Sequence, residues 1–258
     1  DFCMILAIDI GNSTVSFGIY TDMQWKKTWK LDTVREESMY YYQKKIIECF
    51  IEESVIANSV EQVVISSVVP DITNKFVDFF SGMKQSQIVL LNRSIYHLLP
   101  VFTENPYELG TDLMANALAA YEKFRSAALI VDFGTALSFT FVEPDGRISG
   151  VNIVPGMITA IKSLSLHTAQ LQEVPLAKQA DVLGTNTIEA IQNGIIIGYE
   201  GLVRFMIEKI REAKPFPVKV IATGGLAEVL PSDCFDETDK NLTLEGLRLA
   251  GFYSKFPQ

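Results

Sequence analysis

One acidic side chain stands at the end of an apolar run near the N-terminus, directly before a polar turn. Residues 5–8 are apolar and partly β-branched, as in a buried strand, and Asp9 follows them. Gly11 lets the backbone approach a phosphate closely, and hydroxyl side chains follow in the turn. A carboxylate is tolerated beside phosphates mainly when a cation lies between them. The stretch therefore predicts a phosphate-binding hairpin with Asp9 directed at Mg²⁺, although Asp-x-Gly also occurs in plain turns.

A second copy of this plan occurs in the middle of the chain. Residues 128–142 again give an apolar strand, an acid (Asp132), a glycine two residues later, small hydroxyl residues and an alternating strand. Two such hairpins in one chain indicate a duplicated unit. Nearer the C-terminus, a short apolar strand runs into Thr223-Gly224-Gly225 and an expected helix start. Glycine at such a turn lets a flat ring or a phosphate lie against the backbone.

The two hairpins and the late strand-Gly-Gly turn resemble the nucleotide-binding pattern of the superfamily that holds actin, the sugar kinases and the heat-shock chaperone ATPases. The resemblance runs from end to end of the chain. It implies an α/β fold of two duplicated ribonuclease-H-like domains, each a mixed sheet flanked by helices. We expect an N-terminal domain over residues 1–118 and a C-terminal domain over residues 119–258.

Hydrophobic periodicity outlines the elements between these motifs. The first half is expected to contain a strand over 25–31, a helix over 36–56, a strand over 63–69, a helix over 73–83, a strand over 87–91 and a loop over 92–105. The second half is expected to contain helices over 156–167, 187–212 and 244–253, with a polar connection over 163–181. Gly194, Gly198 and Gly201 follow one another along the long helix, where we favour a tight internal helix crossing over a subunit contact.

Composition excludes several classes of protein. The 258 residues are 48% hydrophobic and carry a net charge of −9, so the surface repels polyanions and nucleic acid is not an expected partner. No apolar run approaches the roughly 18 residues that span a bilayer, and no secretory signal is visible. We therefore expect a cytoplasmic protein without a membrane partner. Neither the cysteines (Cys3, Cys49, Cys234) nor the histidines (His97, His167) have the spacing of a disulfide framework or a metal site.

A further motif makes the resemblance more specific. Asn105-Pro106 precedes Glu108-Leu109-Gly110-Thr111-Asp112 and an alanine-rich helix. Together with the two hairpins, residues 150–156 and 186–194, and Thr223-Gly224-Gly225, this order resembles the type III pantothenate kinases, which phosphorylate pantothenate in the first step of coenzyme A synthesis. The resemblance implies ATP-dependent formation of 4′-phosphopantothenate by a homodimer that uses Mg²⁺ and a monovalent cation, K⁺ or NH₄⁺.

The resemblance also implies roles for individual residues. Asp112 is the expected catalytic base, and Asp132 is expected to bind the monovalent cation. The residues expected to contact ATP, with Asp9 also directing its Mg²⁺, are Asp9, Ile10, Gly11, Asn12, Ser13, Thr14, Val15, Ser16, Thr135, Gly224 and Gly225. The residues expected to contact the acceptor are Thr103, Gly110, Thr111, Asp112, Leu113 and, from the neighbouring subunit, Thr187.

Some of these assignments have alternatives. Asp112 and Thr187 stand at expected helix starts, where capping alone would explain them. Leu113 and Thr103 occupy positions where the family usually has arginine and tyrosine, so the nucleotide motifs are better supported than the acceptor motifs. Lys162 is a candidate partner for the pantothenate carboxylate in place of the missing arginine.

Two rival functions remain open at the level of sequence. The first is a kinase of the same fold with a different small-molecule acceptor, which Leu113 and Thr103 favour. The second is a non-enzymatic transcriptional accessory factor of the same family, against which the acidic net charge weighs. ATP turnover measured with and without pantothenate distinguishes these functions.

Overall fold

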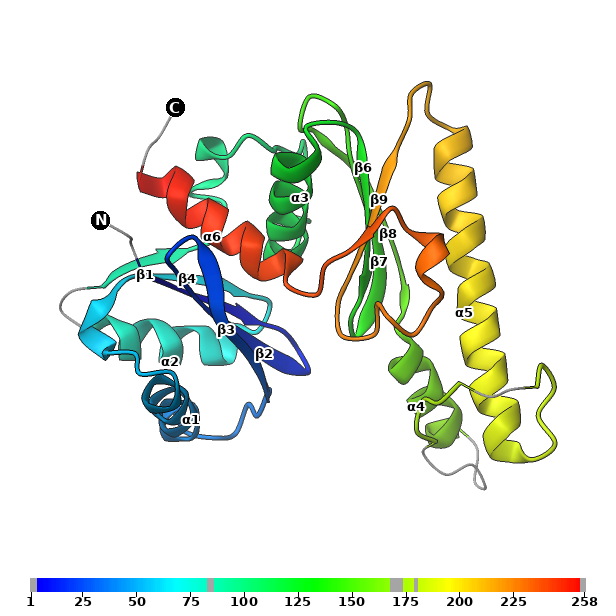
Figure 1. The fold of residues 1–258 in the computed structure, drawn as a ribbon, viewed down its shortest axis with the longest axis horizontal. Coiled ribbons are helices and arrows are strands. Elements are labelled where there is room, and N and C mark those ends of the chain that lie inside the picture. Colours follow the sequence, from blue (N-terminus) through cyan, green and yellow to red (C-terminus); the bar gives the residue numbers. More distant parts are fainter. Residues whose placement is uncertain (1–3, 83–85, 168–173, 179–180, 256–258) are drawn as a thin grey trace. The chain divides into compact units, whose positions relative to one another are not determined.

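The computed structural model describes residues 4–82, 86–167, 174–178 and 181–255 (Figure 1). It contains two five-stranded sheets, with strand orders β3-β2-β1-β4-β5 and β10-β9-β6-β7-β8. The chain divides into two compact units: unit 1 is Asp1–Ala119 with Asn241–Gln258, and unit 2 is Ala120–Lys240. Each unit contains one mixed sheet with helices packed on it, so the expected duplicated α/β fold is confirmed.

The sheet of unit 1 begins as an antiparallel meander and continues with parallel strands. Its strands are β1 (Met4–Ile10), β2 (Thr14–Thr21), β3 (Gln24–Asp32), β4 (Val60–Ser67) and β5 (Gln87–Leu90). In this register Asp9 on β1 is the partner of Ser16 on β2 and of Ser66 on β4. Because side chains alternate between the two faces, Asp9 and Ser66 share one face and Ile8 lies on the other.

Helices cover both faces of this sheet. They are α1 (Met39–Glu52), α2 (Pro70–Ser81), α3 (Thr111–Phe124) and α6 (Leu242–Lys255), with the 3₁₀ helices η1 (Ala57–Ser59) and η2 (Tyr96–Leu98). Helices α1 and α2 pack with Ile8, Phe17 and Ile65 in one apolar core, while α6 contacts β1 and β4 (Figure 1). Helix α2 begins at Pro70, before the expected start at residue 73, because proline lacks the N–H that a first helical residue leaves unpaired.

Unit 2 repeats the plan with a shorter parallel part. Its strands are β6 (Ala128–Phe133), β7 (Ala136–Val142), β8 (Ile148–Pro155), β9 (Lys219–Thr223) and β10 (Glu237–Thr238). Its helices are α4 (Met157–His167) and α5 (Thr187–Glu212), with the 3₁₀ helix η3 (Ser232–Cys234). Val131 and Phe139 of the sheet share a core with Val203 of α5.

Two local expectations for unit 2 need correction. Residues 224–230 form turns rather than a helix, because Gly224 has a φ of 94° and adjacent glycines are poor helix formers. The polar connection expected from residue 163 begins only after α4 ends at His167. Part of that connection, residues 168–173 and 179–180, lies outside the described residues.

The C-terminal helix belongs to unit 1, whereas the expected division places residues 119–258 in one C-terminal domain. Gly246 of α6 lies so close to α3 that a Cβ there would be 1.9 Å from the carbonyl oxygen of Ala115. Gly251 similarly faces Gln62 and Val64 of β4, and Gln62 Nε2 donates to the Gly251 carbonyl at 3.2 Å. The periodicity of an amphipathic helix predicts that it is buried but does not say against which sheet.

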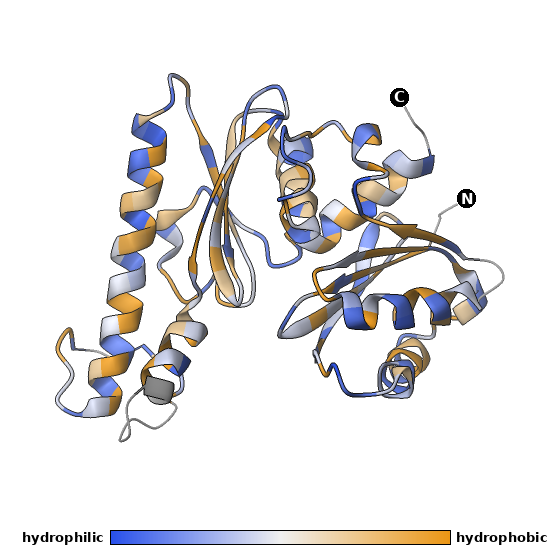
Figure 2. Cartoon of the chain, turned by 180° about the vertical axis from the view of Figure 1, so that it is seen from behind, coloured by the Kyte–Doolittle hydropathy of each residue, from blue (hydrophilic) through white to orange (hydrophobic). Residues whose placement is uncertain are grey.

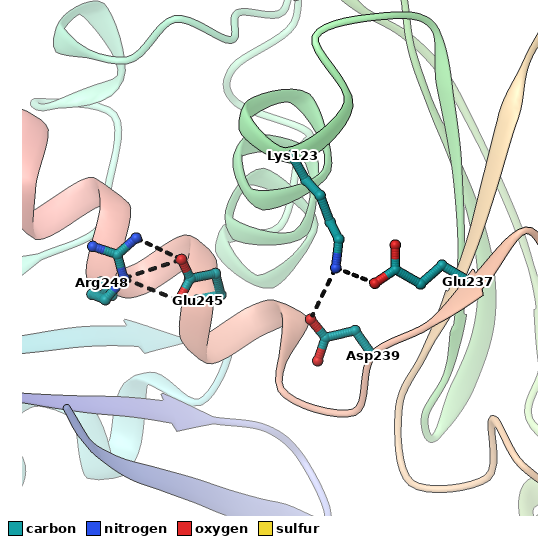
Figure 3. Close-up of polar contacts among 5 residues, drawn as sticks. All are labelled: Lys123, Glu237, Asp239, Glu245 and Arg248. Carbon is teal, nitrogen blue, oxygen red and sulfur yellow. Dashed lines mark hydrogen bonds and ion pairs between the residues drawn. The ribbon is translucent and has the colours of Figure 1, made fainter. Parts of the chain in front are cut away.

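Partly exposed ion pairs involve helices α3 and α6 (Figure 3). Within unit 2, Lys123 of α3 pairs with Glu237 and lies 4.0 Å from Asp239. Within unit 1, Arg248 binds Glu245 one turn earlier in α6, with an Nη2–Oε1 distance of 2.5 Å, and its guanidinium lies 4.8 Å from the centre of the Tyr20 ring. These side chains are partly exposed, so each pair contributes only about 0–1 kcal/mol to stability.

The glycine row on α5 does not form the internal crossing that we expected. No described atom, other than those of the local backbone, lies within 4 Å of a Cβ built on Gly194, Gly198 or Gly201. The buried face of α5 is instead its Ile196–Val203–Ile207 side. The glycine row therefore lies on the outer face of the helix.

The described part of the chain contains no helix long and apolar enough to cross a bilayer. Cys49 and Cys234 are free and buried, and burial raises the pKa of both thiols, so neither is a reactive thiolate. Cys3 lies outside the described residues.

Gly246→Ala is predicted to lower the free energy of unfolding by about 1–3 kcal/mol, because the added methyl group meets backbone of α3 that cannot move aside. Urea titration of the two proteins measures this difference. The control is Gly150→Ala on β8, where nothing described lies within 4 Å of the new Cβ and a slight gain is expected. Equal stability of Gly246→Ala and the unmodified chain would contradict the close α3–α6 contact.

Candidate active site

The first hairpin of unit 1 is held in shape by the segment that follows β3. The Gly11 amide donates to the Thr14 carbonyl at 2.9 Å, which closes the turn. Thr33 then fixes the turn from outside, because its amide donates to the Ser13 carbonyl at 3.0 Å and its hydroxyl to the Gly11 carbonyl at 2.7 Å. Asn12, Ser13 and Thr14 remain exposed. The turn thus offers a fixed backbone to a ligand.

The acceptor motif meets this hairpin through β4. The hydroxyls of Ser66 and Thr111 are 2.8 Å apart, and Thr111 Oγ1 also donates to the Ser67 carbonyl at 3.3 Å. Ser66 is fully buried and is the register partner of Asp9. The structure therefore brings Asp9, Thr111 and the neighbouring Asp112 to the carboxyl ends of β1 and β4.

Asp112 is the second residue of α3 and is partly buried. Its Oδ1 accepts from the Leu113 amide at 2.9 Å, so it satisfies a donor of the first helical turn, as a capping residue would. A Cβ on Gly110 would lie 2.5 Å from the same oxygen, so glycine is needed there to make room for the carboxylate. Burial raises the pKa of Asp112 more than its backbone hydrogen bonds lower it.

Two residues near Asp112 escaped the sequence analysis, which predicted only a loop there. Tyr96 of η2 is buried, and burial together with the negative charge of Asp112 raises the pKa of its phenol to about 12. The Arg93 charge opposes this shift, so both charged groups act on Tyr96. The Arg93 guanidinium carbon lies 4.2 Å from the centre of the Tyr107 ring. Tyr96 therefore lies within electrostatic range of both Asp112 and Arg93.

Unit 2 gathers its own set of predicted residues. Asp132 on β6 is the register partner of Thr223 on β9, whose buried Oγ1 has no hydrogen-bond partner among the described residues. A Cβ on Gly224 would lie 2.6 Å from Asp132 Oδ1 and 2.6 Å from the Phe133 carbonyl oxygen. A carboxylate, an unsatisfied hydroxyl and a cradle that tolerates only glycine fit a cation with oxygen ligands. Gly225, the next residue, is exposed.

Thr135 lies in the turn between β6 and β7. Its carbonyl accepts from the Gly156 amide at 3.0 Å and from the Thr159 hydroxyl at 2.6 Å, which ties the turn to the start of α4. A Cβ on Gly156 would lie 2.3 Å from the Gly134 carbonyl oxygen. The Pro-Gly sequence before α4 therefore serves this close approach to the second hairpin.

The remaining residues predicted to contact the acceptor differ in their burial and hydrogen bonds. Thr103 Oγ1 accepts from the Asn105 amide at 3.2 Å, which is a turn interaction, and Leu113 is partly buried beside Gly110. Thr187 is not the cap of α5, because the Asn186 side chain accepts from the Glu189 amide at 3.1 Å. The Thr187 side chain is exposed.

The charged candidate Lys162 is exposed on α4 and belongs to unit 2, whereas Asp112 belongs to unit 1. His97 lies on η2 and the His167 side chain lies outside the described part. Within the described ranges, no cluster of His, Cys, Asp and Glu side chains has the composition of a metal site.

Comparison with known proteins identifies the family of the chain. A family model described as type III pantothenate kinase matches residues 5–209. A type III pantothenate kinase from Syntrophobacter fumaroxidans is 35% identical over 249 residues, which cover 95% of this chain and 96% of that protein. Another from Citrifermentans bemidjiense is 34% identical over 249 residues, covering 95% and 98%.

Solved structures share the fold at lower identity. A conserved protein from Campylobacter jejuni, proposed to be a Baf family transcriptional activator, has a TM-score of 0.55 at 20% identity and covers 97% of this chain and 98% of its own. The ROK hexokinase from Thermus thermophilus has a TM-score of 0.51 at 12% identity, with 98% and 99% covered. These likenesses concern the fold, whereas the sequence matches identify the lineage. The chain belongs to the type III pantothenate kinase family.

Proposed function

We propose that this chain transfers the terminal phosphoryl group of ATP to the hydroxyl of pantothenate, forming 4′-phosphopantothenate. The observation that carries the proposal is that Asp9 and the Thr111–Asp112 pair meet at the ends of β1 and β4, joined through Ser66. Phosphoryl transfer depends on positioning and on charge neutralisation, so a cation-holding carboxylate and a proton-accepting carboxylate are needed near one another.

In this proposal Asp112 is the catalytic base. It accepts the hydroxyl proton as the substrate oxygen bonds to the γ-phosphorus and the bond to the β-phosphate oxygen breaks. The raised pKa that burial gives Asp112 makes it a better proton acceptor than an exposed aspartate. Tyr96 stays protonated at neutral pH, because its pKa is raised to about 12, and remains a neutral donor beside the carboxylate.

The hairpin of residues 9–16 is assigned to the phosphates of ATP. Gly11 and the exposed residues after it would hold the phosphates through the backbone, and Asp9 would hold Mg²⁺, usually through water. In unit 2, Asp132 and Thr223 would hold K⁺ or NH₄⁺, while Thr135, Gly224 and Gly225 are assigned to the nucleotide. When bound, these cations supply positive charge that offsets the charge of the triphosphate.

Pantothenate is preferred over another acceptor because the type III pantothenate kinase model matches residues 5–209, a span that includes the first hairpin and the acceptor motif, and the named relatives carry the same description. Leu113 and Thr103 lack the charged and phenolic groups usual in the family, which is the reason to test other alcohols. The accessory-factor hypothesis is not favoured, because it gives no role to the partly buried carboxylate of Asp112.

A homodimer is the proposed assembly, and the outer face of α5 supports it. Along this face the open glycines alternate with Ile197, 45% exposed, and Phe205, 57% exposed. Figure 2 shows the hydrophobic segments along α5. Glycines without side chains allow a second helix to approach closely, and the exposed Thr187 hydroxyl at the start of α5 would serve the partner's acceptor site.

A coupled assay tests the proposed reaction. ATP consumption should depend on pantothenate and should yield one phosphopantothenate for each ADP formed. Turnover that starts only with a different alcohol would make the chain a kinase with another acceptor. Absence of turnover with every acceptor, despite ATP binding, would support the non-enzymatic function.

Asp112→Asn is predicted to lower kcat by about 10²- to 10⁴-fold, because the variant cannot accept the hydroxyl proton. Affinity for Mg·ATP should stay unchanged, since Asp9 and the hairpin are intact. Steady-state kinetics and nucleotide titration measure the two quantities. The matched control is Asp71→Asn, which removes an exposed carboxylate from the first turn of α2 and should retain full turnover. Full turnover in Asp112→Asn would leave Asp112 with a capping role alone.

Asp112→Asn is also predicted to raise the melting temperature at pH 8. Burial raises the folded-state pKa of Asp112 above its unfolded value, so ionising it costs stability as pH rises from the ordinary aspartate value of about 3.9 through the folded pKa. Asparagine removes this cost and keeps an acceptor for the Leu113 amide. The gain should shrink as the pH is lowered toward 4. A gain that persists unchanged at low pH, or a loss at pH 8, would show that the buried charge is not the cause.

Phe205→Lys is predicted to convert the dimer into a monomer, because a charge would be buried in the apolar face of α5. Sedimentation over a range of concentrations measures the assembly, and specific activity should fall with it because the acceptor site loses Thr187 of the partner. Ile51→Lys on α1, at a position 73% exposed, is the control and should leave the dimer intact. A fully active monomer would contradict the shared acceptor site.

A further inference from the structure

Arg35 is a cation placed directly on the first hairpin, and none of the predicted roles uses it. Its Nη2 donates to Asn12 Oδ1 at 2.9 Å. Arg35 and Asn12 are both exposed, and both belong to unit 1. A guanidinium has five N–H donors, so this bond leaves further donors for another acceptor.

The segment that carries Arg35 donates hydrogen bonds to oxygen atoms of the turn. Thr33 occupies the carbonyls of Gly11 and Ser13, and Arg35 occupies the amide oxygen of Asn12. In a trans peptide the N–H points away from the C=O, so the amides that follow these two carbonyls point away from the segment. These amides are thus directed away from the segment, and a guanidinium lies at the edge of the turn.

Lys75 of α2 fixes the backbone on which Arg35 stands. Its Nζ donates to the Arg35 carbonyl at 3.3 Å and to the Glu37 carbonyl at 3.2 Å. Neither Arg35 nor Lys75 has a carboxylate within ion-pair distance among the residues that the structure describes. In a chain of net charge −9, both Arg35, which contacts the turn, and Lys75, which contacts the Arg35 backbone, thus lack an acidic partner among the described residues.

We propose that Arg35 is a phosphate-binding residue of this enzyme: its guanidinium, held by Asn12, donates to a terminal phosphate of ATP, and Lys75 positions it through the backbone of residues 35–37. The proposal rests on the assignment of the first hairpin to the phosphates. Arginine suits this role because its planar fork matches two phosphate oxygens and keeps its charge at every working pH.

The test is binding of Mg·ATP, inorganic tripolyphosphate and adenosine to the full chain by calorimetry, without an acceptor. Arg35→Gln keeps an amide donor for Asn12 but removes the charge. It should lower the affinity for Mg·ATP and for tripolyphosphate by about 10- to 100-fold. Adenosine affinity should be unchanged. Arg35→Lys should bind both phosphate ligands with an affinity between those of Arg35→Gln and the unmodified chain, because lysine keeps the charge but lacks the planar guanidinium. Lys44→Gln, an exposed charge removal on α1, is the control and should bind like the unmodified chain.

Lys75→Met tests the positioning role. It should weaken Mg·ATP binding by itself and add nothing in the Arg35→Gln background. Additive losses would mean that Lys75 acts on the nucleotide independently of Arg35, which contradicts the positioning role.

Normal tripolyphosphate binding by Arg35→Gln would overturn the proposal, as would equal weakening of adenosine, which would show that Arg35 only supports the turn. These outcomes are separable from the proposed reaction. If the unmodified chain phosphorylates pantothenate while Arg35→Gln binds ATP normally, the proposed reaction is supported and the proposed role of Arg35 is contradicted. If Arg35→Gln loses phosphate affinity but no pantothenate is phosphorylated, the Arg35 role stands and the acceptor is different. Failure of the unmodified chain to bind ATP would contradict both the proposed reaction and the proposed role of Arg35.

Discussion

The hydrogen bond between the hydroxyls of Ser66 and Thr111 connects the end of β4 with the start of α3 in unit 1. Ser66 is fully buried, and a buried hydroxyl without a partner is costly, so the start of α3 is constrained to meet the end of β4. Because β4 lies beside β1 in parallel, the same contact sets where Asp112 stands relative to Asp9. The distance between Asp9 and Asp112, the proposed cation-holding and proton-accepting carboxylates, thus depends on sheet register.

The pairing register of β1 is strictly defined because one face of the sheet is buried. Leu6, Ile8 and Ile10 fill the core under α1 and α2, so a slip of one residue would bury Asp9 there and expose the apolar side chains. Unit 2 repeats the arrangement. In both units the acid of the Asp-x-Gly hairpin has a hydroxyl residue as its partner on the adjacent parallel strand, Ser66 for Asp9 and Thr223 for Asp132. The two hydroxyls differ in that Ser66 is bonded to α3, whereas Thr223 has no partner among the described residues, as a ligand-facing group would.

Local pattern was enough to predict the hairpins, the position of Asp9 and Asp132 at strand ends, and the starts of α3 and α5. These features depend on a few adjacent residues, so the sequence carries them directly. Contacts distant in sequence could not be predicted. Arg35 donates a hydrogen bond to Asn12 across the β2–β3 hairpin, and the charge of Asp112 acts on Tyr96, which lies in a segment without periodicity.

Two further differences have the same origin. Glycine spacing along α5 indicates that something approaches closely, but only the structure shows that no other described part of the chain does so. Gly246 of α6 instead lies at a tight helix crossing. The turn after Gly225 depends on the positive φ of Gly224, which is set by the Asp132 carboxylate and the Phe133 carbonyl beside it. A glycine in the sequence shows that the backbone there has more conformational freedom. Whether it serves a turn or a close contact depends on the tertiary structure around it.

The central claim is that Ser66 and Thr111 hold the acceptor base in register with the phosphate hairpin. A double-mutant cycle of Ser66→Ala and Thr111→Val, read out as kcat for pantothenate phosphorylation, tests it most directly. Each single change should lower kcat by about 5- to 30-fold with Mg·ATP affinity preserved, and the double variant should be no slower than the slower single, a coupling of about 1–2 kcal/mol. Losses that multiply in the double variant, or single variants with normal kcat, would contradict the account.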